Sequence, residues 1–132
     1  MQRSYSVKTV ALTVGADVKW LDNLLSHFSV VGVDRAGRGL ERRISDTAIT
    51  SVAICRMLSE ELGIALGKAV SIANEIAAGR AANDSRFIAA PGLILHFSLD
   101  EIDRRVQARL ADAVEAVAHV RRGRPPRRSH AD

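Results

Sequence analysis

Three side chains that can recognise a nucleic acid occur close together near the start of the sequence. Lys19 can donate a hydrogen bond to guanine or to a phosphate oxygen, and Asn23 can pair with adenine through its amide. Two roles stay open for Trp20, namely a contact to nucleic acid and a packing role in the core or an interface. If a helix presents this segment outward, the chemistry predicted is recognition of base edges and phosphates.

A second group of cations follows within the next twenty or so residues. It consists of Arg35, Arg38, Arg42 and Arg43, opposed only by Asp34 and Glu41. Such arginines can bind phosphates or enter a minor groove, and we expect this role above all for Arg38 and Arg43. Arg42 has an alternative role, because strand alternation places it on one face with Leu40 and Ile44, where it can pair with a carboxylate of the same domain.

The positive charge is concentrated instead of spread along the chain. The net charge is +4, yet residues 1–120 carry equal numbers of basic and acidic residues, whereas residues 121–132 carry five arginines against Asp132. Within this tail, residues 122–125 read Arg-Gly-Arg-Pro and resemble the core of an AT-hook, which lies in narrow minor grooves. Arg122 and Arg124 are therefore candidate DNA contacts, and the alternative is a disordered solubilising tail.

Residue types suited to catalysis or metal binding do not form a recognisable pattern. The four histidines are scattered, no serine or cysteine lies in a nucleophile motif, and the acidic residues at 100, 101 and 103 favour a helix start. The single Cys55 lies in an apolar segment, which favours a buried structural thiol over a sensor. We therefore expect no enzyme activity, no cofactor and no metal site.

The elements that must position these side chains can be predicted from capping residues and apolar spacing. Ser6 can cap a helix over residues 7–13 that ends at Gly15, and a second helix can run from Asp17 to about Ser26. Residues 30–33 and 40–44 are predicted to form a hairpin. Two apolar helices are then expected, over residues 45–62 before Gly63 and over residues 66–78 before Gly79.

The C-terminal part is predicted to contain a strand pair or one edge strand around residues 91–92, and then a helix to about residue 120. Ser98 and Glu101 have the capping-box spacing. The helix carries a narrow apolar stripe that can pack on the preceding helices or on a second chain, and we favour the second chain. The residues expected at a dimer interface are Leu93, Leu95, Ile102, Val106, Leu110, Ala113 and Val117.

Residues 5–78 resemble the DNA-binding head of the MerR family of bacterial transcription regulators. The motifs are Tyr-Ser-Val-Lys at 5–8, Val-Ala to Gly-Ala-Asp-Val-Lys at 10–19, Gly-Leu-Glu-Arg-Arg-Ile-Ser at 39–45 and Leu-Ser-Glu-Glu-Leu-Gly-Ile-Ala-Leu at 58–66. The resemblance implies a small relative without an effector domain. Ser6, Lys8 and Asp17 are further candidate DNA contacts, and for Asp17 we favour a role as the cap of the second helix. The sequence departs from the family at 22–25, where Asp-Asn-Leu-Leu replaces an Arg-Tyr-Tyr-Glu-like run.

These observations together predict a mainly α fold: a MerR-like winged helix-turn-helix head with a small β wing, followed by a C-terminal strand and a dimerisation helix. The predicted division is a head at 1–79, a dimerisation or partner-binding segment at 80–120 and a basic disordered tail at 121–132. The expected function is a cytoplasmic, nucleoid-associated homodimer that binds double-stranded DNA, regulates transcription and makes no membrane contact. The alternative is an antitoxin-like or phage-type accessory protein that binds another protein through residues 86–120 and DNA for autoregulation.

Overall fold

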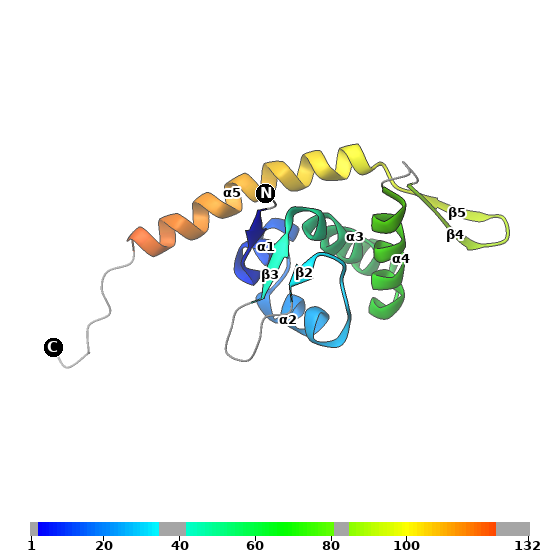
Figure 1. The fold of residues 1–132 in the computed structure, drawn as a ribbon, viewed down its shortest axis with the longest axis horizontal. Helices are drawn as coiled ribbons and strands as arrows, with labels where there is room; N and C mark the ends of the chain where they lie inside the picture. The colour runs from blue at the N-terminus through cyan, green and yellow to red at the C-terminus, as the bar shows by residue number, and fades with distance from the viewer. Residues whose placement is uncertain (1–2, 35–41, 81–84, 124–132) are drawn as a thin grey trace.

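The protein is mainly helical, with two small antiparallel sheets. The computed structural model describes residues 3–34, 42–80 and 85–123, the last five of these in their backbone alone. In this part of the chain (Figure 1) the helices are α1 (Val7–Val14), α2 (Val18–His27), α3 (Asp46–Leu62), α4 (Leu66–Gly79) and α5 (Leu99–Gly123). The strands are β1 (Ser4–Tyr5), β2 (Val33–Asp34), β3 (Arg43–Ser45), β4 (Arg86–Ala90) and β5 (Leu93–His96). The prediction of a mainly α fold is confirmed.

The first two helices lie within a residue or two of their predicted bounds. The Ser6 hydroxyl accepts a hydrogen bond from the backbone N–H of Thr9 at 3.2 Å and so begins α1. Gly15 ends α1 in the left-handed region, at φ 70° and ψ 38°, which glycine adopts without steric cost. Asp17 occupies the N-cap position of α2, but its side chain makes no capping hydrogen bond. The chain therefore reverses between α1 and α2 at Gly15, as predicted.

A three-stranded sheet joins segments that precede and follow residues 35–41 in the sequence. The strand order is β1-β3-β2, with Tyr5 and Val33 both opposite Ile44. The hairpin prediction is confirmed in β2 and β3, although β2 begins only at Val33, and β1 was not predicted. Gly32 makes the preceding turn at φ 94°, and its carbonyl accepts a hydrogen bond from the Ser45 N–H at 3.1 Å. Arg35, Arg38 and Leu40 lie outside the described residues.

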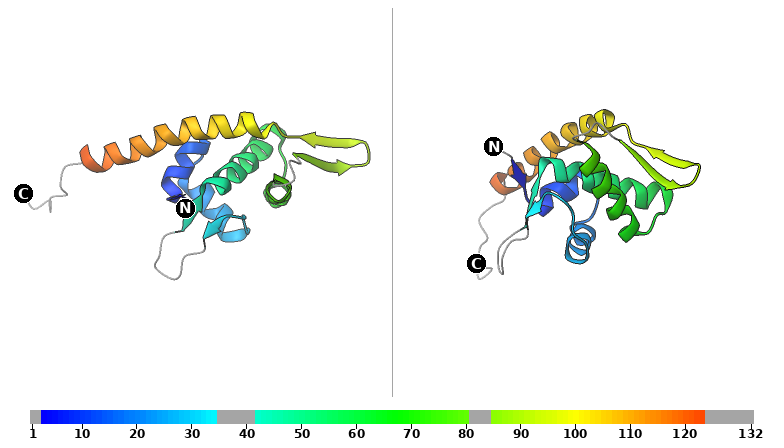
Figure 2. Two further views of the ribbon diagram at one scale, coloured as in Figure 1. Left: turned by 45° about the horizontal axis from the view of Figure 1, so that its top comes forward. Right: turned by 45° about the vertical axis from the view of Figure 1, so that its right-hand side comes forward.

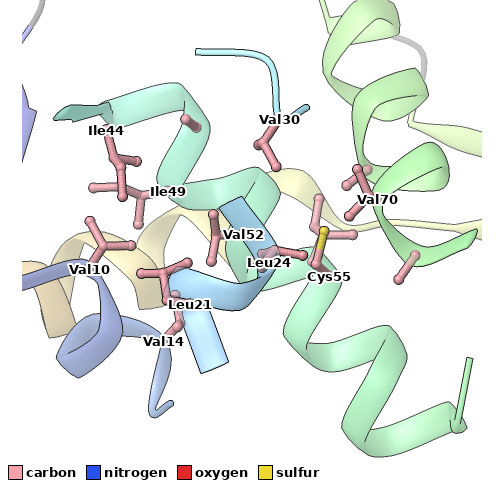
Figure 3. Packing of buried hydrophobic residues seen from close by; sticks show 14 of the residues in the cluster. Val10, Val14, Leu21, Leu24, Val30, Ile44, Ile49, Val52, Cys55 and Val70 are labelled. Atoms are coloured by element: carbon pink, nitrogen blue, oxygen red, sulfur yellow. The ribbon is translucent and has the colours of Figure 1, made fainter. Parts of the chain in front are cut away.

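Helices α3 and α4 supply the centre of the core. The Ser45 hydroxyl caps α3 by accepting from the Ala48 N–H at 3.3 Å, and Gly63 ends the helix in the left-handed region. Both predicted helices are confirmed, and α4 extends one residue further than predicted. Cys55 is fully buried at the middle of α3, among the apolar side chains shown in Figure 3. This confirms that Cys55 is a buried thiol.

The long helix α5 packs along the outside of α1 and continues past it (Figures 1 and 2). Its side chains Val106, Leu110 and Ala113 are buried within the same chain. We expected these three side chains to face a second chain, and the structure instead gives them partners in their own chain. The reason is that α1 buries six of its eight residues, so it needs an apolar neighbour on the side away from α2.

The other residues of the expected dimer interface differ in exposure. Ile102 and Leu95 are half-buried against the same core, Val117 is half-buried, and Leu93 is 54% exposed. None of these placements tests whether the chain self-associates. The predicted boundary at residue 80 separates two segments of sequence that share a single hydrophobic cluster, because Phe87, Phe97, Val106 and Leu110 belong to the same cluster as Val10 and Ile49. The tail at 124–132 lies outside the described residues.

A polar clamp fixes α5 to α3 and to the end of α4. Arg80 donates to both carboxylate oxygens of Asp103 at 3.0 and 3.2 Å, and the Thr50 hydroxyl donates to Asp103 at 2.8 Å. Bidentate guanidinium–carboxylate geometry of this kind is specific in direction as well as strong. The clamp therefore sets the position at which α5 crosses the other helices.

The strand pair β4–β5 is confirmed, and it projects from the helices at the end opposite the last turns of α5 (Figure 2). Phe87 is its inner anchor, because it is buried and lies below the Lys68 ammonium at 5.5 Å. On the outer face, Ile88 pairs with Ile94, and the two are 70% and 52% exposed. No helix in the described part of the chain combines the length and apolar character needed to cross a membrane.

Candidate nucleic-acid interface

Helix α2 presents one apolar and one polar face. Leu21, Leu24 and Leu25 are buried against the core, where Figure 3 shows the first two. Lys19, Asn23 and Ser26 are exposed and follow one another at spacings of four and three residues, so they share the outward face. Two of the three sequence-predicted side chains at the start of this helix, Lys19 and Asn23, are thus brought together on the surface.

Trp20 is directed toward the neighbouring helix α3 instead of outward. It is half-buried, and the guanidinium carbon of Arg56 lies 5.0 Å from the centre of its ring. Arg56 also donates to the Gly15 carbonyl at 3.4 Å and pairs with Glu60 at 3.5 Å. The structure therefore gives Trp20 a packing contact with α3. Arg56, which the sequence did not single out, connects the α1–α2 turn to α3.

Arg42 links the sheet to the polar face of α2. Its guanidinium donates to the Ser26 hydroxyl at 3.2 Å and lies 3.7 Å from the Asp22 carboxylate. The alternative considered for Arg42, a carboxylate partner within the same chain, is therefore present. The contact places the base of the β2–β3 pair beside α2, as Figure 1 also shows, and it neutralises an acidic group on that face.

Arg43, the first residue of β3, extends toward β1. It donates through Nη2 to the Ser4 carbonyl at 2.7 Å and through Nε to the Ser4 hydroxyl at 3.2 Å, while the residue remains exposed. Lys8 is exposed on α1 and makes no hydrogen bond or ion pair with another described residue. Ser6 is half-buried, and its hydroxyl is engaged with Thr9. Arg43 and Lys8 thus offer surface charge, whereas Ser6 has a structural role.

The remaining candidates cannot be placed on this surface. Arg35, Arg38 and Arg124 lie outside the described residues, and the side chain of Arg122 is not described. The surface that can be built from the described residues consists of Lys19, Asn23 and Ser26 on α2 with Arg42 at its edge. We call it the α2 face.

Sequence reasoning missed Ser26 on the α2 face and Asp22 beside it. Ser26 follows Asn23 by three residues, so extending the helical spacing beyond the cationic residues would have found it. Asp22 could not have been found in the same way. Its role comes from the ion pair with Arg42, and the distance between the two side chains depends on the tertiary fold. Within the described ranges, no group of three or more histidine, cysteine, aspartate or glutamate side chains is arranged to hold a metal ion.

Comparison of the chain with known protein families, with curated proteins and with solved structures found no match. The arguments for its function therefore rest on the arrangement of its own residues.

Proposed function

We propose that this protein is a sequence-specific DNA-binding regulator of transcription that acts as a homodimer, with a MerR-like winged helix-turn-helix. In this proposal α1 and α2 are the helix-turn-helix, α2 enters the major groove, and the β2–β3 pair is the base of the wing. Lys19 and Asn23 then contact base edges or phosphates from the first half of the recognition helix.

The observation that carries the proposal is the joint exposure of Lys19 and Asn23 on a short helix whose opposite face is buried. A recognition helix must be held rigidly from behind while its polar face stays accessible, and α2 meets both requirements. Two further features support it. Gly15 sets the turn between the two helices, and the hydrogen bond from the Arg42 guanidinium to the Ser26 hydroxyl, at 3.2 Å, holds the strand pair beside α2.

The charge on the described part of the α2 face is modest, since Asp22 offsets Arg42. Lys8 and Arg43 lie on neighbouring elements and can add phosphate contacts. In this proposal, base-edge contacts of α2 provide the specificity, and cations outside α2 provide much of the salt-dependent affinity.

The first experiment is selection of duplex sequences from a random pool with the purified full chain, followed by fluorescence anisotropy over a salt series. Asn23→Ala is expected to weaken binding to the selected sequence by about 5- to 100-fold and to relax preference at one base position. Lys19→Gln is expected to reduce the salt slope by about one if Lys19 contacts phosphate.

Lys68→Gln is the matched control, because it removes one positive charge from α4, where the ammonium lies over the ring of Phe87 and not on the α2 face. It should leave both the affinity for the selected sequence and the base preference unchanged. Failure to enrich any duplex at low ionic strength would overturn the proposal. So would equal effects of Asn23→Ala and Lys68→Gln. Light scattering tests the dimer, and a single-chain mass at all accessible concentrations would contradict it.

The second candidate function is a partner-binding accessory protein, and the exposed outer face of the β4–β5 hairpin favours it. Ile88 and Ile94 are neighbours across the two strands, and both are more than half exposed. A stoichiometric foreign protein that binds the chain and is lost from Ile88→Ser/Ile94→Ser would favour this function. Self-association alone would favour the regulator.

A further inference from the structure

A cleft of about 520 Å³ lies between the end of α1, the middle of α3 and the first half of α5. Its size falls within the range of small-molecule sites, about 300–1,000 Å³. Apolar side chains from all three helices contribute to its lining, which are Val14, Ala53, Met57, Ile102 and Val106. None of these residues belongs to the α2 face.

The charged residues that line the cleft leave positive charge on α5. Arg56 pairs with Glu60 at 3.5 Å, and Glu101 pairs with Arg104 at 3.2 Å. Arg105 and Arg109 also line the cleft, and neither side chain has a hydrogen bond or ion pair to another residue in the described ranges. The Glu61 side chain is in the same situation. Three arginines and three glutamates line the cleft in all, and those without a side-chain partner in the described ranges are two guanidiniums and one carboxylate.

The two guanidiniums are spaced to act together. Arg105 and Arg109 are four residues apart on α5, which places them on the same side of the helix. Arg109 extends to the α1–α2 turn, because a methyl group at Gly15 would lie 3.9 Å from its Nη1. Guanidinium groups at such a spacing bind carboxylate, phosphate or sulfonate oxygens well.

We propose that this cleft binds a small amphipathic anion. Its apolar part lies on Val14, Ala53 and Met57, and its anionic group binds Arg105 and Arg109. The ligand class follows from the combination: an apolar molecule alone would leave the guanidiniums unused, and a small inorganic anion would leave the apolar lining exposed.

A ligand bound in the cleft would alter the contacts that Arg56 makes with α2 and with the turn before it. This residue lines the cleft, contacts Trp20 at 5.0 Å and donates to the Gly15 carbonyl, so an anion that attracts its guanidinium would disturb both contacts. Any effect on DNA binding rests on the proposed function. Ligand binding itself does not, and it can be measured without DNA.

The test is fluorescence titration of the purified full chain, without DNA, using anilinonaphthalene sulfonate as the probe. N-phenylnaphthylamine, which has a similar apolar body and no anionic group, is the paired neutral probe. We expect saturable binding of one sulfonate per chain, accompanied by a change in emission of Trp20, the sole tryptophan. The neutral probe should bind at least about tenfold more weakly.

Variants locate the binding site of the probe. Arg105→Gln/Arg109→Gln should weaken sulfonate binding at least about tenfold and leave the neutral probe unaffected, whereas Lys68→Gln should change neither. Ala53→Leu fills the apolar lining with the arginines intact, and it should weaken both probes. Circular dichroism confirms that each variant is folded.

Three results would overturn the proposal. They are the absence of saturable sulfonate binding, binding of the neutral probe as tight as that of the sulfonate, and sulfonate affinity unchanged in the double arginine variant. If no DNA sequence is ever selected but the sulfonate binds as described, the proposed function fails while the ligand site stands.

Discussion

Asp103 connects three helices, and its removal should destabilise the protein by a predictable amount. Its carboxylate accepts two hydrogen bonds from Arg80 and one from Thr50, at distances of 2.8 to 3.2 Å. Hydrogen bonds to charged groups contribute about 1.5–3 kcal/mol when well buried, but the Arg80 and Asp103 side chains are 36% and 31% exposed. We therefore expect Asp103→Ala to lower the free energy of unfolding by about 2 kcal/mol, and Asp103→Asn by about 1 kcal/mol.

The pH dependence of this effect follows from the pKa of Asp103. Partial burial alone would raise the pKa, but the hydrogen bonds from Arg80 and Thr50 and the charge of Arg80 together lower it from the ordinary value of 3.8. Because the folded-state pKa is the lower one, the stabilisation is complete above pH 3.8 and is lost as the pH falls through the folded-state value. The difference between wild type and Asp103→Asn should therefore be largest near neutral pH and should shrink in acid.

Urea denaturation followed by circular dichroism measures both effects. With a slope of about 1.5 kcal/mol/M, Asp103→Ala should lower the midpoint by about 1 M near neutral pH. Asp112→Asn is the control, because Asp112 is an exposed acid on the same helix with no hydrogen bond or ion pair to another described residue. The reasoning is refuted if Asp103→Asn matches Asp112→Asn, or if its deficit is the same near neutral pH and at about pH 3.

Two further predictions concern Gly32, in the turn before β2, and the buried thiol of Cys55. Gly32→Ala should lower the free energy of unfolding by about 2–4 kcal/mol in the same assay. The φ angle of Gly32 is 94°, and the added methyl would lie 2.7 Å from the Ser45 hydroxyl that caps α3 and 2.9 Å from the Ala48 side chain. A loss below about 0.5 kcal/mol would contradict this prediction. Cys55 should resist a thiol reagent in mildly alkaline buffer and react fully after unfolding. Burial raises the pKa of its thiol to about 12, and a backbone hydrogen bond opposes this by a smaller amount. Rapid reaction of the folded chain would contradict the burial of Cys55.

Features with local causes could be predicted from the sequence. Ser45 and Gly63 bracket α3 because a cap acts on groups within one turn of itself, and the same holds for Ser6 and Gly15 around α1. The β4–β5 hairpin was also predictable, since two β-prone runs flank a Pro-Gly turn. In each case the residues that determine the structure lie beside it in the sequence.

Features that depend on contacts between distant segments could not be predicted. β1 contains only two residues and exists because β3 lies beside it. The packing of α5 on α1 was not the favoured prediction, because an apolar stripe fits a second chain as well as the preceding helices. In the structure α1 buries Val7, Val10, Ala11 and Val14, which need an apolar neighbour. For the candidate site, Lys19 and Asn23 were placed correctly on the surface by helical geometry. The orientation of Trp20 depends on Arg56, thirty-six positions later, and could not be anticipated.

The length of α5 limits what a single partner can engage. At about 1.5 Å per residue, its 25 residues extend roughly 37 Å. The clamp at Asp103 and the buried Leu110 hold its first half firmly, so the hairpin and the far end of α5 stay on opposite sides of the molecule (Figure 1). A small protein bound to Ile88 and Ile94 would therefore leave the other end of the helix accessible, and both ends could be occupied at the same time.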